Sequence, residues 1–136
     1  MTPELTTLTL AALLQVIQFA LFAIPANVEL GTVKTLSPRD KDRMPTPLVD
    51  QVSTKTARLL RAYNNHIESL ILFAIACVVI TISGQSTPIT ATCAWIYVTA
   101  RAAYIPAYYF GWVPWRSFIW FASFVAITIM LLAAFL

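Results

Sequence analysis

The chain has 136 residues, of which 59% are hydrophobic and 11% are charged, with a formal net charge of +3. Soluble domains are typically about 45–50% apolar and about 25% charged, so a soluble core of this size could not hide so much apolar surface. The apolar content excludes a disordered chain, the three glycines exclude a collagen-like fibre, and the two cysteines exclude a disulfide-rich secreted scaffold. The composition therefore indicates an integral membrane protein.

Charge is concentrated in one part of the chain, because twelve of the fifteen charged residues lie between Glu29 and Glu68. About 20 apolar residues, each rising ~1.5 Å, cross the ~30 Å hydrocarbon core of a bilayer. The long uncharged stretches predict an all-α membrane protein with four transmembrane helices, bundled in a single domain of residues 1–136. The expected helices are residues 4–26, 54–83, 88–110 and 114–136.

The first expected helix is a retained span rather than a signal peptide. Its amino end carries the acidic Glu4 and no basic side chain, and no cleavage site of small residues follows it. Its apolar stretch also exceeds the about 7–15 residues of a signal peptide.

The next segment, residues 27–53, alternates acidic and basic side chains and has three prolines between Ser37 and Pro47, which is typical of a solvated connector. Basic residues are concentrated here and at the start of the second helix, whereas the turn between the second and third helices has none. The positive-inside rule then predicts a cytoplasmic loop and both termini outside the cytoplasm. Contact with anionic membrane lipids is enough to explain these cations, and no nucleic acid is needed as a partner.

Two ionisable residues lie where the membrane penalises charge. In a tight hairpin of the second and third helices, Glu68 and Arg101 lie about 23 Å and about 21 Å from the turn. A charge at that depth costs at least about 2.5–3.5 kcal/mol unless it is paired or hydrated. We therefore expect both side chains to face the interior and to form a structural ion pair.

Polar side chains recur on one face of each of these two helices, at spacings of three and four residues. They are Arg61, Asn65 and Glu68 on the second helix, and Tyr97, Arg101, Tyr104 and Tyr108 on the third. Facing each other near the cytoplasmic boundary, they predict a pocket for a zwitterionic or anionic ligand, since guanidinium groups bind carboxylates and a carboxylate binds an ammonium group. An interfacial aromatic belt and a purely structural bridge are the alternatives.

No metal site is predicted, because the single histidine, His66, lies off this polar face and the cysteines, Cys77 and Cys93, have no metal-ligand neighbour.

The segment from Arg61 to Ala74, with its Arg, Asn and Glu at residues 61, 65 and 68, resembles the second-helix signature of the MAPEG proteins, the membrane-associated proteins in eicosanoid and glutathione metabolism. Ala-Arg-x-x-Tyr at residues 100–104, and Arg-Ser at residues 116–117, resemble the third- and fourth-helix patterns of that family. The chain looks closest to the bacterial branch.

The resemblance implies a homotrimer that holds glutathione, a co-substrate, in clefts between subunits on the cytoplasmic side of a bacterial inner membrane. The implied glutathione-binding residues are Arg61, Asn65, Glu68, Tyr104, Tyr108 and Ser117. Arg116 corresponds to the arginine that stabilises the glutathione thiolate, and a nearby guanidinium does favour a thiolate. That thiolate would attack lipophilic electrophiles or hydroperoxides from the bilayer, which makes the protein a glutathione transferase or peroxidase.

Two other classes stay open. A small multidrug transporter also has four short spans and an intramembrane glutamate, but such transporters carry it in the first helix, and here no charge lies between Leu5 and Val28. The third class is a non-catalytic structural membrane protein, in which the polar residues serve only folding.

Overall fold

The computed structural model describes all 136 residues and contains helices and no strands. The four long helices are α1 (Pro3–Leu30), α4 (Thr54–Ile82), α5 (Pro88–Tyr109) and α6 (Trp115–Ala133), and two one-turn helices, α2 (Thr32–Thr35) and α3 (Leu48–Gln51), lie in the long loop. Three of the long helices, α1, α4 and α6, are long and apolar enough to cross a membrane. The protein is therefore a multi-pass helical membrane protein, and the polar residues of α5 lower its hydropathy below that of the other three.

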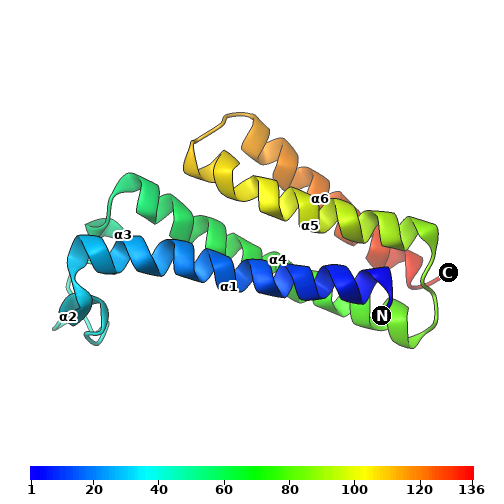
Figure 1. The fold of residues 1–136 in the computed structure, drawn as a ribbon, viewed down its shortest axis with the longest axis horizontal. Helices are drawn as coiled ribbons and strands as arrows, with labels where there is room; N and C mark the ends of the chain where they lie inside the picture. Colours follow the sequence, from blue (N-terminus) through cyan, green and yellow to red (C-terminus); the bar gives the residue numbers. More distant parts are fainter.

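The long helices form two pairs. α1 lies beside α4 and α5 beside α6, with both termini and the α4–α5 turn at one end of the molecule and the long loop at the other (Figure 1). Toward the end with the long loop, the α5–α6 pair diverges from the α1–α4 pair (Figure 1). The two pairs therefore lie closer together near the termini than near the long loop (Figure 1).

The buried core lies in the other half of the bundle, nearer the termini. It draws on residues 73–80 of α4, 93–98 of α5 and 126–130 of α6. The rings of Phe73 and Tyr97 stack there with centroids 3.8 Å apart. Close packing in this half keeps the helices together, so the polar residues of the other half are not required for the core.

Two carboxylates of α1 bind the beginnings of the helices that carry the polar residues. Glu4, which is fully buried, accepts hydrogen bonds from the hydroxyls of Ser86 (2.9 Å) and Thr90 (2.6 Å) at the start of α5. Glu29 accepts hydrogen bonds from the Ser53 backbone N–H (2.7 Å) and the Thr56 hydroxyl (2.7 Å) at the start of α4. A carboxylate at a helix N-terminus is favourable because of the unpaired N–H groups and the helix dipole, so α1 fixes where α4 and α5 begin.

The helix ends differ in places from those expected. α1 continues through Pro25 to Leu30, whereas the sequence prediction ended it at residue 26. A proline inside a transmembrane helix is tolerated, and the helix ends instead at Gly31, whose φ of 82° favours glycine. α6 begins one residue later than expected and ends at Ala133, and the loop expected to be a plain connector contains α2 and α3.

Candidate functional site

A cavity of about 670 Å³ opens between α4, α5 and α6, on the side where the two helix pairs diverge. Nine residues line it, and six of them are site residues predicted from the sequence: Arg61 and Asn65 of α4, Tyr104 and Tyr108 of α5, and Arg116 and Ser117 of α6. Three successive long helices thus bring these polar groups to one place.

The wall formed by α5 is aromatic and holds a cation. The rings of Tyr104 and Tyr108, one helical turn apart, meet edge to face with centroids 5.5 Å apart. The guanidinium carbon of Arg116 lies 4.9 Å from the centroid of the Tyr108 ring, a cation–π contact. Tyr108 therefore holds the Arg116 side chain at the cavity even though α5 and α6 are joined by a turn without regular structure.

Behind this wall, the buried Arg101 connects α5 to α4. Its side chain is 1% exposed, and its Nη2 donates a hydrogen bond of 2.8 Å to Oδ1 of Asn65. Its guanidinium carbon also lies 4.8 Å from the centroid of the Tyr104 ring. Arg101 does not line the cavity itself but touches two residues that do. Because the amide oxygen of Asn65 is engaged, its NH₂ group is the part left to donate to a ligand.

The ion pair expected between Glu68 and Arg101 is not formed in the chain, since Arg101 binds Asn65 instead. Glu68 lies in an adjoining groove of about 180 Å³ that shares Asn65 and Trp120 with the main cavity. Residues three apart on a helix differ by about 60° in direction, which is enough to turn Asn65 toward α5 and Glu68 toward the groove beside α6. The hairpin argument considered how far each residue lies from the turn but not the direction in which its side chain points.

Tyr97, the fourth residue of the polar face predicted on α5, also lies away from the cavity. It is fully buried in the core, and its hydroxyl pairs with that of Ser69 at 2.9 Å. His66 is likewise buried, with Nε2 2.9 Å from the backbone oxygen of Ala11, so it joins α4 to α1. No group of three or more His, Cys, Asp or Glu side chains is placed to hold a metal ion.

The cavity lining combines cationic, polar and apolar side chains. None of its lining residues is acidic, and two of them, Arg61 and Arg116, are cations. An anionic ligand would supply the opposite charge. The structure fits an anionic molecule that also offers groups for amide and phenol hydrogen bonds.

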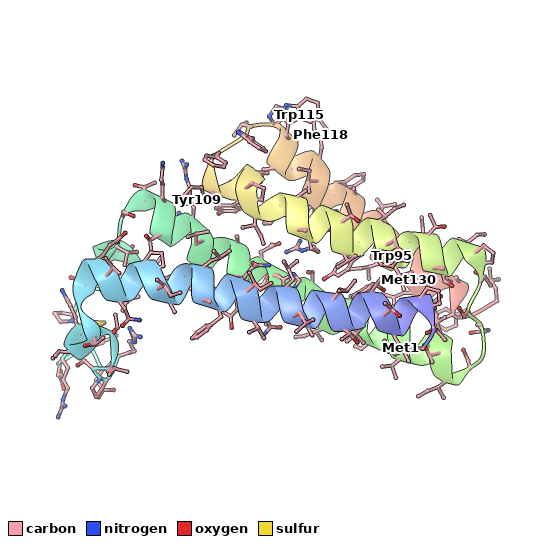
Figure 2. The ribbon with its side chains drawn as sticks, in the orientation of Figure 1. Met1, Trp95, Tyr109, Trp115, Phe118 and Met130 are labelled. Atoms are coloured by element: carbon pink, nitrogen blue, oxygen red, sulfur yellow. The ribbon has the colours of Figure 1, made fainter.

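The sequence interpretation missed the apolar side, which consists of Phe118, Trp120 and Phe121 of α6. Trp120 and Phe121 follow Arg116 and Ser117 at a spacing of four residues, so they share a helix face with them. The sequence shows this spacing, but in a largely apolar helix two aromatic residues do not stand out from their neighbours. Figure 2 shows Phe118 and Trp115 at the start of α6 and Tyr109 at the end of α5, near the turn that joins them.

A family model described as the MAPEG family matches residues 7–136, nearly the whole chain. No curated protein and no solved structure matches the chain.

Proposed function

The chain belongs to the MAPEG family, a family of glutathione-related membrane proteins, and on that basis we propose that it binds glutathione in the cavity between α4, α5 and α6 and uses the glutathione thiolate on lipophilic compounds. The observation that carries this proposal is the convergence of six polar side chains from three helices on a cavity without an acidic residue. Glutathione has two carboxylates, one ammonium group, two peptide bonds and a thiol. The cavity offers a complementary partner for most of these.

The roles follow from the chemistry of each group. Arg61 pairs with a carboxylate of glutathione, because a guanidinium binds a carboxylate through two parallel hydrogen bonds. The NH₂ group of Asn65 donates to a peptide oxygen, and the phenols of Tyr104 and Tyr108 bind further polar atoms of the tripeptide. Glu68 lies in the adjoining groove, so a ligand reaches it by extending past Asn65. There the Glu68 carboxylate would bind the ammonium group of glutathione.

Arg116 acts on the thiol. A free thiol has a pKa of about 8.5, and an adjacent guanidinium favours the thiolate, which is the nucleophile. Ser117 adds a hydroxyl donor beside it. The thiolate sulfur forms a bond to an electrophilic carbon while a leaving group such as chloride departs with the electron pair of its bond. Alternatively it attacks the terminal oxygen of a hydroperoxide, which breaks the O–O bond, releases an alcohol and leaves a glutathione sulfenic acid that a second glutathione converts to the disulfide and water. Phe118, Trp120 and Phe121 give such a substrate an apolar place next to the sulfur.

Assembly and orientation complete the proposal. Glu68 is exposed on the single chain, although α4 is apolar enough to span a membrane, and a carboxylate facing lipid is costly. A neighbouring subunit that covers the groove removes this cost, which supports a homotrimer with the site between subunits. We place all four long helices across a bacterial inner membrane, with the basic loop in the cytoplasm and both termini outside.

Turnover in proteoliposomes tests the proposal. The purified protein is supplied with glutathione and either a chloronitroaromatic electrophile or cumene hydroperoxide. We expect glutathione-dependent product that Arg116→Gln strongly reduces at neutral pH and Arg39→Gln leaves unchanged, because Arg39 lies in the loop and hydrogen-bonds the backbone of Thr35. Equal rates for the native protein and Arg116→Gln would overturn the role of Arg116, and a native protein without glutathione binding would overturn the function.

A further inference from the structure

A second hollow, of about 520 Å³, lies in the long loop at the end of α1 and shares no residue with the cavity described above. Its walls come from three places in the sequence: the end of α1 with α2, the turn that follows Asp40, and α3. The polar residues that line it are Lys34, Ser37, Arg43, Thr46 and Gln51. No acidic residue lines it, although three aspartates lie in the same loop.

The loop is held in shape around this hollow. The Thr35 hydroxyl of α2 donates a hydrogen bond to the Asn27 side chain of α1, which ties α2 to the span. The backbone N–H of Met44 donates to the backbone carbonyl oxygen of Asp40 at 2.7 Å, which closes a turn, and Gln51 Nε2 donates to the backbone carbonyl oxygen of Thr46 at 2.6 Å. The side chain of Met44 is buried beneath, at 7% exposure. The hollow is therefore part of a folded loop.

Two cations line the hollow, and no acidic residue does. Lys34 comes from α2 and Arg43 from the turn after Asp40, and neither side chain forms an ion pair or a hydrogen bond within the chain. Hydroxyl groups of Ser37 and Thr46 lie in the same wall. Two unpaired cations with nearby hydroxyl donors suit a phosphate group, which accepts several charge-assisted hydrogen bonds.

The surroundings of the hollow are those of a membrane surface. Leu30, the last residue of the membrane-spanning α1, and Val33 line it, and Val33 is 88% exposed. Two more apolar side chains at this end, Val28 and Leu36, are 81% and 83% exposed. Water is a poor environment for such side chains, whereas lipid chains beside α1 would cover them.

From these observations we propose that the hollow binds the phosphate of an anionic phospholipid, with the acyl chains lying along the end of α1. Lys34 and Arg43 hold the phosphate from two sides, and Val28, Val33 and Leu36 contact the chains. Juxtamembrane cations attract anionic lipids of the cytoplasmic leaflet in general, but here two of them are built into one hollow. The site stands apart from the proposed glutathione cavity, and the failure of one would not affect the other.

Native mass spectrometry of the detergent-solubilised protein, titrated with phosphatidylglycerol or phosphatidylcholine, tests this site. We expect phosphatidylglycerol to bind more tightly, and the double variant Lys34→Gln, Arg43→Gln to weaken its binding by about tenfold. The matched control, Arg39→Gln with Lys41→Gln, removes the same charge from the same loop but from outside the hollow. We expect it to change the affinity by less than about twofold.

Three results would overturn the proposal: equal binding of phosphatidylcholine, an equal loss in the control variant, or competition by inorganic phosphate as effective as that by the lipid. The last result would assign the hollow to free phosphate. The side chains of Lys34 and Arg43 are exposed, so we expect both double variants to keep the helical circular dichroism of the native protein. If the double variant is unstable, the single variant Lys34→Gln provides the same comparison. We expect it to change the logarithm of the dissociation constant for phosphatidylglycerol by about half as much.

Discussion

Arg101 and Asn65 are joined by a hydrogen bond of 2.8 Å that connects α5 to α4 directly behind the cavity. The bond fixes which side of the Asn65 amide faces the cavity, and the same guanidinium stacks against Tyr104. Arg101 keeps two further nitrogens, Nε and Nη1, buried without a partner in the chain. A buried guanidinium with unpaired donors is costly, which indicates that Arg101 serves the site rather than the stability of the bundle.

This relationship predicts that Arg101 acts on glutathione binding through Asn65. Arg101→Met and Asn65→Ala should each weaken glutathione binding, and the double variant should lose less than the sum, with a coupling energy of about 1–2 kcal/mol. The dissociation constants of the four proteins measure it. Arg101→Lys, which keeps a donor, should regain part of the affinity, whereas additive losses would show that Arg101 does not position Asn65.

Arg116 predicts a dependence of activity on pH. Its guanidinium favours the thiolate, so bound glutathione should have a thiol pKa below the about 8.5 of a free thiol. Arg116→Gln should raise that pKa and move the rising limb of the rate profile to higher pH, and Arg116→Lys should move it less. Rates across a pH series, with the ultraviolet absorbance of the thiolate, check this. An unchanged profile in Arg116→Gln would show that the arginine does not contact the sulfur.

The turn between α5 and α6 predicts a difference between two glycine variants. Gly111 has a φ of +67°, and a Cβ there would lie 3.1 Å from Nη1 of Arg58, which donates a hydrogen bond to the Tyr109 carbonyl. Gly84 has a similar φ of +70° but open space around it. Gly84→Ala should cost about 1–2 kcal/mol for the backbone alone, and Gly111→Ala should cost more.

Thermal unfolding followed by circular dichroism compares these two variants. Because the turn also sets the distance between Tyr108 and Arg116, only Gly111→Ala should weaken glutathione binding as well. Equal stability and equal affinity for the two variants would show that the contact of Arg58 with the turn has no role in forming the site.

Helical spacing and a hairpin argument selected four of the nine residues that line the cavity, and the resemblance to the family added Arg116 and Ser117. Arg61 and Asn65 share a face of α4, Tyr104 and Tyr108 share a face of α5, and an antiparallel hairpin brings the two faces level. Spacing gives the position along a helix well, but a rotation of about 60° separates one partner from another. For that reason Asn65, and not Glu68, binds Arg101.

The remaining features depend on tertiary contacts that local patterns do not encode. Trp120 lies in a largely apolar helix, and only its four-residue spacing from Arg116 marks the side that faces the cavity. Lys34 and Arg43 line the same hollow only because a proline-rich loop folds back on itself, and neither a helical nor a strand spacing relates the two residues. The extension of α1 to Leu30 follows from the tolerance of a membrane helix for Pro25, which a rule for soluble helices would have counted as an end.

Calorimetric titration of glutathione into the purified protein, with Arg61→Ala and Arg39→Ala as matched variants, tests the central claim most directly. We predict saturable binding to the native protein and to Arg39→Ala, and a loss of at least about tenfold in Arg61→Ala, since the guanidinium partner of a carboxylate is removed. If the native protein gives no heat of binding, or if Arg61→Ala binds glutathione with unchanged affinity, the assignment of this cavity to glutathione is contradicted.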